Sequence, residues 1–95
     1  MQVWNAQKLA RSLAGHDKEE LFLVIMEDKD WVWLCDGKRR KLDKLKKKKK
    51  IHVQIIKNLP DQLLEKMNRI ECDAHVRKIL AAYSGSEKKE NQAEN

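Results

Sequence analysis

The feature that most constrains the fold is an unbroken apolar run between two acids, Glu20-Leu21-Phe22-Leu23-Val24-Ile25-Met26-Glu27. The run is short and rich in residues that favour β-structure, so a strand is favoured over a helix. A strand that is apolar on both faces must be covered on both faces. In a chain of 95 residues we expect one cover to be the inside of a curled sheet and the other to be a helix packed outside it.

Four other segments predict strands that complete one sheet with this one. They are residues 6–13, 30–36, 38–45 and 51–56. The first is half apolar and ends in a turn signal built on Gly15 and Asp17. The Asp36-Gly37 pair predicts a tight two-residue hairpin. Five short strands with brief turns predict a mostly β fold with a small, strongly bent antiparallel barrel.

The strand predicted at residues 30–36 carries two tryptophans. Alternation places Val32 and Leu34 on one face, and Trp31, Trp33 and Cys35 on the other. Exposed aromatic rings beside a basic strand can stack on unpaired bases, so Trp31 and Trp33 are candidate stacking residues. The interpretation we favour from the sequence is that both tryptophans pack under C-terminal helices, because those helices need an apolar floor.

Two amphipathic helices are predicted after residue 56, where the apolar spacing changes. Their stripes are Leu59, Leu63, Leu64, Met67 and Ile70, followed by Val76, Ile79, Leu80 and Tyr83. Asn58 and Asp73 are predicted to cap the two helices, and Ser84-Gly85 to end the second. Beyond Tyr83 the residues are nearly all small, polar or charged, which predicts a disordered tail. The chain thus divides into a barrel (residues 1–57), a two-helix extension packed on the barrel (58–83) and a tail (84–95).

Positive charge is concentrated between Lys38 and Lys50, where ten basic residues and one acid give a net charge of +9. The whole chain carries +6, so the residues outside this segment sum to −3. A phosphate backbone neutralises such a density with a gain from counterion release, so RNA affinity should fall steeply with salt. A solvated lysine-rich loop without a partner is the alternative. We expect phosphate contacts from a basic return strand and a flexible lysine arm, namely Lys38, Arg39, Arg40, Lys41, Lys44, Lys46, Lys47, Lys48, Lys49 and Lys50.

Three motifs occur in an order that matches a known family. They are Arg11-Ser12-Leu13-Ala14-Gly15-His16-Asp17-Lys18, then Trp31-Val32-Trp33-Leu34-Cys35-Asp36-Gly37-Lys38-Arg39-Arg40-Lys41-Leu42 with the lysine run after it, and Asp73-Ala74-His75-Val76-Arg77-Lys78-Ile79-Leu80. The unit around the first is similar to a KOW motif. Roughly residues 6 to 82 resemble the small KOW-domain RNA-binding proteins of Firmicutes, which are related to a KOW-type large-subunit ribosomal protein of archaea and eukaryotes. The resemblance implies an SH3-like barrel that binds ribosomal or other structured RNA.

The resemblance also assigns RNA contacts to the first turn. Gly15, Asp17 and Lys18 match the motif directly, whereas His16 stands where an arginine is usual and Glu19 where a glycine is usual. The turn therefore loses one cation and gains one acid relative to the family. Its candidate RNA-binding residues, with the strand before it, are Arg11, Gly15, His16 and Lys18.

Metal and catalytic chemistry are not expected. Cys35, Cys72 and the 3 histidines form no Cys-x-x-Cys or His-x₃-His spacing. The sequence has no Gly-rich phosphate loop, no nucleophile elbow and no carboxylate pair framed by apolar residues. We therefore expect a non-catalytic protein without a cofactor and without a small-molecule substrate.

The expected partner is structured RNA, ribosomal RNA first, with ribosomal proteins as additional partners. Two distant cysteines, the lack of a signal peptide and the lack of an apolar run of about 18 residues indicate a reduced, cytoplasmic protein. The alternative function is an interaction adaptor that grips a peptide through the face of Trp31 and Trp33. Binding to an anionic membrane through the polybasic run is the weakest of the three hypotheses.

Overall fold

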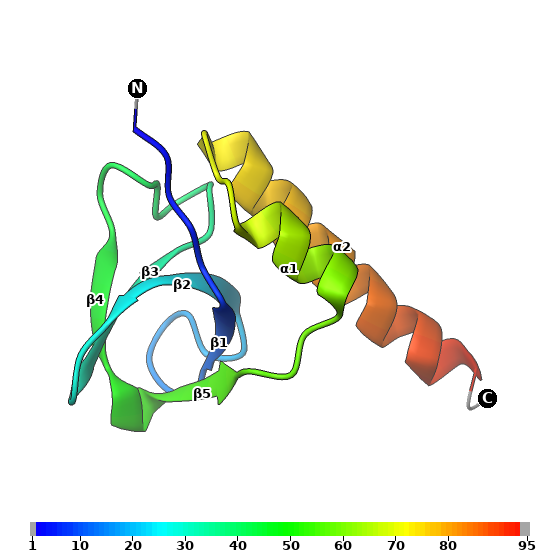
Figure 1. The fold of residues 1–95 in the computed structure, drawn as a ribbon. Coiled ribbons are helices and arrows are strands. Elements are labelled where there is room, and N and C mark those ends of the chain that lie inside the picture. The colour runs from blue at the N-terminus through cyan, green and yellow to red at the C-terminus, as the bar shows by residue number, and fades with distance from the viewer. Residues whose placement is uncertain (1, 94–95) are drawn as a thin grey trace.

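The computed structural model describes the backbone of residues 2–93 and the side chains of residues 2–85. One 5-stranded antiparallel sheet, in the order β4-β3-β2-β1-β5, curls into an open barrel that two helices flank (Figure 1). The elements are β1 (Lys8–Ser12), β2 (Leu21–Glu27), β3 (Trp31–Cys35), β4 (Lys46–Lys49), the 3-10 turn η1 (Lys50–His52), β5 (Val53–Ile56), α1 (Asp61–Met67) and α2 (Asp73–Ala93). The predicted fold class, a small SH3-like barrel followed by two helices, is confirmed.

Strand β2 is covered on both faces, as its apolar run predicts. Phe22 and Val24 lie inside the barrel, and Leu23 lies beneath the helices. The interior cluster consists of Ala10, Phe22, Val24, Val32, Leu34 and Val53. Burying a side chain as large as Phe22 or Leu23 contributes about 2–3 kcal/mol, so this strand is the main link between the two halves of the core.

The helices cover the outer face of the sheet near β1 and β2, away from β4 (Figure 1). Their predicted apolar stripes are confirmed, since Leu63, Met67, Ile70, Val76 and Ile79 are buried together. The floor beneath them is made of side chains from the strands and the loop before β4, including Leu9, Leu23, Cys35 and Leu42. Burial, with the charges of Asp73 and Asp36 adding to it, raises the pKa of the Cys35 thiol to about 12. Cys35 is therefore an inert packing residue.

Both ends of the helical region differ from the sequence prediction. The N-cap position of α1 is Pro60 rather than Asn58, and no side chain caps it. Helix α2 continues through Ser84 and Gly85 to Ala93, so the predicted end at Gly85 is wrong. Gly85 does not have a positive φ, and the Lys, Glu, Gln and Ala residues after it favour helix. The predicted tail, residues 84–95, is therefore helical to Ala93, and residues 94 and 95 lie outside the described part.

The loop between β3 and β4 also differs from the prediction. We call residues 36–45 the basic loop. The Asp36 carboxylate accepts hydrogen bonds from the backbone amides of Lys38 and Arg40, both at 2.9 Å, and β4 begins only at Lys46. The tight hairpin and the return strand over residues 38–45 are therefore wrong. The physical reason is that Leu42 is buried in the cluster beneath the helices, which draws the loop away from the sheet.

Gly37 attaches the basic loop to α2. Its φ is +77°, and a Cβ at this position would lie 2.6 Å from the Asp73 carbonyl oxygen and 2.9 Å from Arg77 Cγ. The Arg77 guanidinium donates a hydrogen bond of 2.6 Å to the Gly37 carbonyl. The Asp73 carboxylate, predicted to cap α2, accepts a hydrogen bond of 2.8 Å from the Leu42 amide. The start of α2 thus fixes the loop that carries much of the basic charge.

Candidate nucleic-acid interface

The lysine run at residues 46–49 is a strand, so the prediction of a flexible arm is wrong. Strand β4 pairs with β3 in the register Lys46↔Leu34, Lys47↔Trp33, Lys48↔Val32 and Lys49↔Trp31. Without β4, the edge of β3 would leave backbone amide and carbonyl groups unpaired. A lysine-rich edge strand satisfies those groups and also discourages pairing with another chain. The lysines are therefore distributed by the alternation of a strand.

Facing residues of an antiparallel pair share one face of the sheet. Lys46 and Lys48 face Leu34 and Val32, which belong to the barrel interior. Lys47 and Lys49 face Trp33 and Trp31 on the outer surface. Strand β4 thus sends alternate lysines to opposite sides of the sheet.

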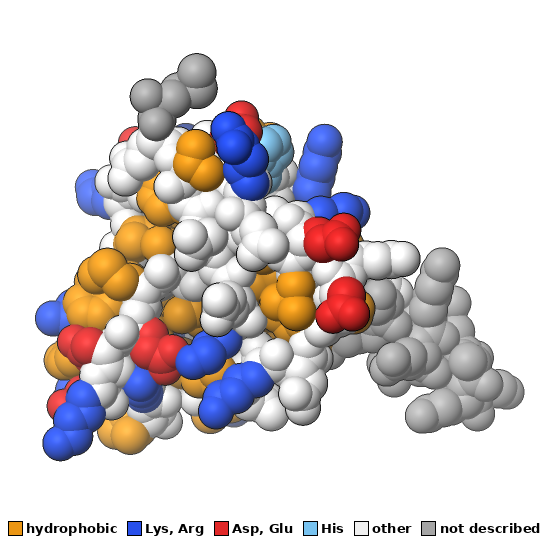
Figure 2. All heavy atoms as spheres, viewed as in Figure 1, with side chains coloured by type: hydrophobic (Ala, Val, Ile, Leu, Met, Phe, Trp, Pro, Cys, Tyr) orange, Lys and Arg blue, Asp and Glu red, His pale blue; other side chains and the backbone are white. Residues whose placement is uncertain are grey.

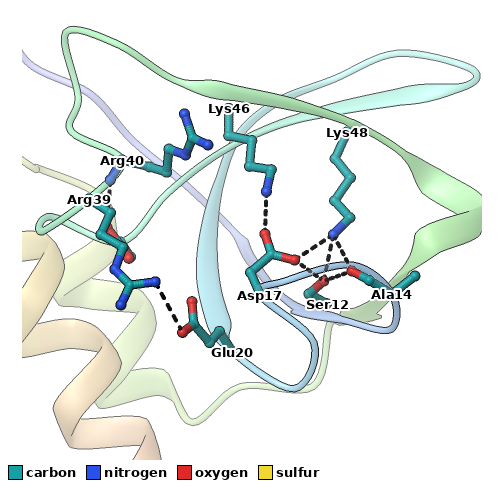
Figure 3. Close-up of polar contacts among 9 residues, drawn as sticks. Ser12, Ala14, Asp17, Glu20, Arg39, Arg40, Lys46 and Lys48 are labelled. Carbon is teal, nitrogen blue, oxygen red and sulfur yellow. Dashed lines mark hydrogen bonds and ion pairs between the residues drawn. The ribbon is translucent and has the colours of Figure 1, made fainter.

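The inward lysines meet a buried carboxylate in the turn before β2. Figure 3 shows Lys46 and Lys48 reaching down to Asp17, which is only 8% exposed. Lys46 pairs with one carboxylate oxygen, and Lys48 Nζ lies 2.8 Å from the other. Lys48 also donates hydrogen bonds to the Ser12 hydroxyl at 2.5 Å and to the Ala14 carbonyl at 2.9 Å. We call Ser12, Asp17, Lys46 and Lys48 the Asp17 cluster.

The Asp17 cluster keeps its carboxylate ionised. Burial disfavours the charged form, but hydrogen bonds from Lys46, Lys48 and Ser12 outweigh burial and hold the pKa of Asp17 well below its ordinary value. The Ser12 hydroxyl donates to Asp17 over 2.7 Å. The cluster therefore fixes the turn at residues 13–19 against β4 throughout the physiological pH range.

A second acid neutralises another lysine of the run. Glu27 lies 2.8 Å from Lys50 Nζ and 2.6 Å from Lys8 Nζ. Hydrogen bonds from Lys50 and then Lys8 lower the pKa of Glu27. Lys46, Lys48 and Lys50 are thus all engaged within the molecule, which weakens their case as phosphate contacts.

The exposed cations of the basic segment are those of the basic loop and of the outer face of β4. They are Lys38, Arg39, Arg40, Lys41, Lys44, Lys47 and Lys49. Arg39 lies near Glu20, at 3.9 Å, but its side chain remains 79% exposed. These seven residues form the part of the basic segment that remains open to a ligand.

The structure brings the predicted KOW turn and the basic segment together. The Asp17 cluster joins the turn to β4, and the Arg39–Glu20 contact joins the basic loop to the residue that follows the turn (Figure 3). His16 and Lys18 are exposed on this turn. Arg11 is half-buried and donates a hydrogen bond of 3.0 Å to the Glu19 carbonyl, so it helps to hold the turn.

Two residues of the turn adopt the left-handed conformation. Gly15 has a φ of +88° and Glu19 a φ of +72°. Gly15 therefore supplies a backbone conformation that a residue with a Cβ resists. The conformation that Glu19 adopts is one that glycine would adopt without strain.

Replacing Glu19 with glycine is expected to raise the free energy of unfolding by about 0.5–1 kcal/mol. A non-glycine residue in the left-handed conformation costs about 1–2 kcal/mol, which the substitution would remove. Glycine has more conformational freedom in the unfolded chain, and this offsets part of the gain in stability. Urea denaturation monitored by circular dichroism measures the change. The neighbouring control, Lys18→Gly, lies at an ordinary φ and should lose stability instead. Loss of stability in both variants would contradict this assignment of strain.

The tryptophans do not pack under the helices, so that interpretation is wrong. Neither Trp31 nor Trp33 belongs to the cluster beneath α1 and α2. Lys47 Nζ lies 4.4 Å from the ring centroid of Trp31 and 5.5 Å from that of Trp33, and Lys49 Nζ lies 5.7 Å from that of Trp31. The helices cover only the part of the outer face that Leu23 and Cys35 reach. Both tryptophans are half-buried and lie among exposed lysines.

Apart from the resemblance, which includes Asp17 in its first motif, the sequence did not indicate that Asp17 pairs with lysines. Its partners Lys46 and Lys48 are 29 and 31 positions away in the chain, and only the curl of the sheet joins them. The lysine run is continuous and gives no sign of which of its members face Asp17, so the available signal was the acidic balance outside the basic segment. Within the described residues, no three His, Cys, Asp or Glu side chains gather in a way that could hold a metal ion. No helix in the described part has the length and apolar character needed to cross a membrane.

Comparison with protein-family models and with curated protein sequences finds no match to this chain.

Proposed function

We propose that this chain is a non-catalytic, cytoplasmic protein that binds structured RNA, ribosomal RNA first, through the basic loop and the outer face of β4. The observation that carries the proposal is the division of the lysine run. Lys46, Lys48 and Lys50 have acidic partners within the molecule, whereas Lys47 and Lys49 and the loop cations are exposed. Exposed cations concentrated in one continuous segment, the basic loop and β4, favour a polyanionic partner.

The mechanism is electrostatic and depends on shape. Cations on the loop and strand would contact phosphates, and such contacts position a protein without reading sequence. An RNA duplex offers phosphates and 2′-hydroxyls along a wide, shallow minor groove. Because Gly37 and Leu42 fix the basic loop to α2, the loop meets the RNA in a preformed conformation, which reduces the ordering cost of binding.

The test is equilibrium binding to purified large ribosomal subunits across a salt series. The variant Arg40→Gln/Lys41→Gln/Lys44→Gln removes three exposed loop cations, and Lys57→Gln/Lys66→Gln/Lys78→Gln removes three exposed cations elsewhere. The loop variant is expected to bind about 10- to 100-fold more weakly. Its slope of log affinity against log salt should fall by about 0.9 for each phosphate that the variant no longer neutralises.

The control variant has the same net charge as the loop variant, so it should keep most of the affinity. Equal losses in the two variants would show that only the overall charge matters and would remove the case for a loop interface. Absence of binding at low salt would overturn the proposal and favour the adaptor. An adaptor for an apolar peptide would be expected to carry an aromatic groove away from the lysines. Trp31 and Trp33 instead lie among lysines, which suits an apolar peptide less well.

A further inference from the structure

An aromatic surface lies beside the proposed phosphate-binding residues on the outer face of β3 and β4. We call it the tryptophan surface and define it by Met26, Trp31, Trp33, Lys47, Lys49 and Ile51. Met26 pairs with Trp33 across the sheet and is 54% exposed, and Ile51 is 78% exposed. On the face shown in Figure 2, hydrophobic side chains likewise reach solvent among basic and acidic ones.

A hollow of about 430 Å³ lies at one end of this surface. It is lined by Lys29, Asp30, Trp31, Lys49, Lys50 and Ile51. A space of this size is within the range that holds a small ligand, and one nucleotide would fill much of it. The Trp31 ring offers a stacking partner, and the exposed cations Lys29 and Lys49 offer phosphate partners. Lys50 is paired with Glu27, and Asp30 adds one carboxylate to the lining.

We propose that the tryptophan surface stacks unpaired bases of the RNA whose backbone the basic loop contacts. The inference rests on the proposed function and deepens it, because it assigns a preference for single-stranded nucleotides next to a duplex. The faces of bases within a duplex are already stacked on their neighbours, so only unpaired bases can use the rings. Stacking of this kind accepts any base, since every base has a π-face.

The lysines over the rings occupy the place that a base would take. Lys47 Nζ lies within 5.5 Å of both ring centroids, close enough for a cation–π contact with each. Such a contact at an exposed site is weaker than stacking of a base on an aromatic ring. An arriving base would therefore displace the ammonium group, and the long side chain could move it to the phosphate of the same nucleotide. The cation is retained near the RNA while the ring gains a base.

The surface suits a nucleic acid better than an apolar peptide. Each tryptophan faces a lysine directly across the sheet, in the pairs Trp31↔Lys49 and Trp33↔Lys47. A base with its phosphate matches this alternation of ring and cation, because it also joins a flat apolar face to a negative charge.

The test compares three RNA probes on the wild-type protein and needs no variant. They are a blunt duplex, the same duplex with a 3′ overhang of four nucleotides, and the same duplex with an overhang of four abasic nucleotides. The abasic overhang keeps the phosphates and removes the bases. We expect the natural overhang to bind about 10-fold or more tightly than the abasic one, with quenching of tryptophan fluorescence.

The variants Trp31→Leu and Trp33→Leu complete the test, after circular dichroism has shown that each is folded. Each should lose the preference for the natural overhang, keep the affinity for the blunt duplex and keep the salt slope, because no cation is removed. Binding of all three probes with equal affinity would overturn this inference and leave the proposed function standing. Absence of binding to every probe would overturn the proposed function itself.

Discussion

Replacing Asp17 with asparagine is expected to lower the free energy of unfolding by about 3 kcal/mol at pH 7. The substitution keeps the shape of the side chain but leaves Lys46 and Lys48 without their anionic partner. Their side chains are only 26% and 11% exposed, so water cannot fully replace the carboxylate. Urea denaturation at pH 7 measures the loss. The control Asp43→Asn alters an exposed acid of the basic loop and should change stability by no more than about 0.5 kcal/mol.

The same cluster predicts how stability depends on pH. The pKa of Asp17 is lower in the folded protein than its ordinary value of 3.8, so the ionised carboxylate stabilises the fold above that value. This stabilisation should be lost as the pH falls below about 4 toward the lowered pKa. The difference between the wild type and Asp17→Asn should therefore be largest at pH 7 and shrink in acid. Glu27 shifts in the same direction and adds to the acid sensitivity of both proteins. A difference that stays constant between pH 7 and pH 3 would contradict this account of Asp17.

Replacing Gly37 with alanine is expected to destabilise the protein by about 3 kcal/mol. The left-handed conformation costs an alanine about 1–2 kcal/mol, and overpacking against backbone adds about 1–3 kcal/mol. The atom that a Cβ would approach most closely is the Asp73 carbonyl oxygen at 2.6 Å, and this oxygen cannot move without shifting α2. Thermal and urea unfolding measure the change.

Gly85 is the matched control for Gly37, with an expected effect of opposite sign. It lies within α2 and does not have a positive φ, and an added Cβ would have no other part of the described structure within 4 Å besides its own helix backbone. Gly85→Ala should therefore stabilise the protein by about 0.5–1 kcal/mol, because alanine favours the helix. Similar effects of the two substitutions would show that Gly37 does not dock on α2 as described.

The sequence predicted the features of the fold that depend on local apolar spacing. The run at residues 21–26 required a cover on each face, and the barrel interior and the helices supply these covers. The helical stripes led by Leu63 and Val76 also followed from spacing alone. These patterns are reliable because the period of the apolar residues directly sets which face of an element is buried.

The sequence could not predict features that depend on contacts between distant segments. A run of identical lysines carries no contrast between its two faces, so its alternation as a strand became visible only from its pairing with β3. The wide loop after Asp36 follows from burial of Leu42 beneath helices that come later in the chain. The partial exposure of Trp31 and Trp33 depends on how far the helices extend over the sheet, which the spacing of apolar residues does not specify.

The sequence predicted where the candidate site lies, but not which of its lysines hold the structure together and which are open to a ligand. The basic segment and the turn at residues 13–19 were both selected from the sequence, and the structure places them side by side. Lys46 and Lys48 were expected to contact phosphate together with their neighbours, whereas they hold the turn through Asp17. The net charge of a segment does not reveal which of its members have partners inside the molecule.

The measurement that tests the central claim most directly compares Lys47→Gln/Lys49→Gln with Lys46→Gln/Lys48→Gln. Both variants lose the same charge from the same strand, and each is measured for stability by urea denaturation and for affinity to a blunt RNA duplex at low salt. If the inward pair does not fold, Lys46→Gln and Lys47→Gln give the same comparison singly. The outward pair is expected to lose about 10-fold or more in RNA affinity with little change in stability. The inward pair should lose about 2–3 kcal/mol of stability and, while folded, retain more RNA affinity than the outward pair. The reverse pattern, or equal effects of both pairs on both quantities, would contradict the division of the lysine run into a structural face and a binding face.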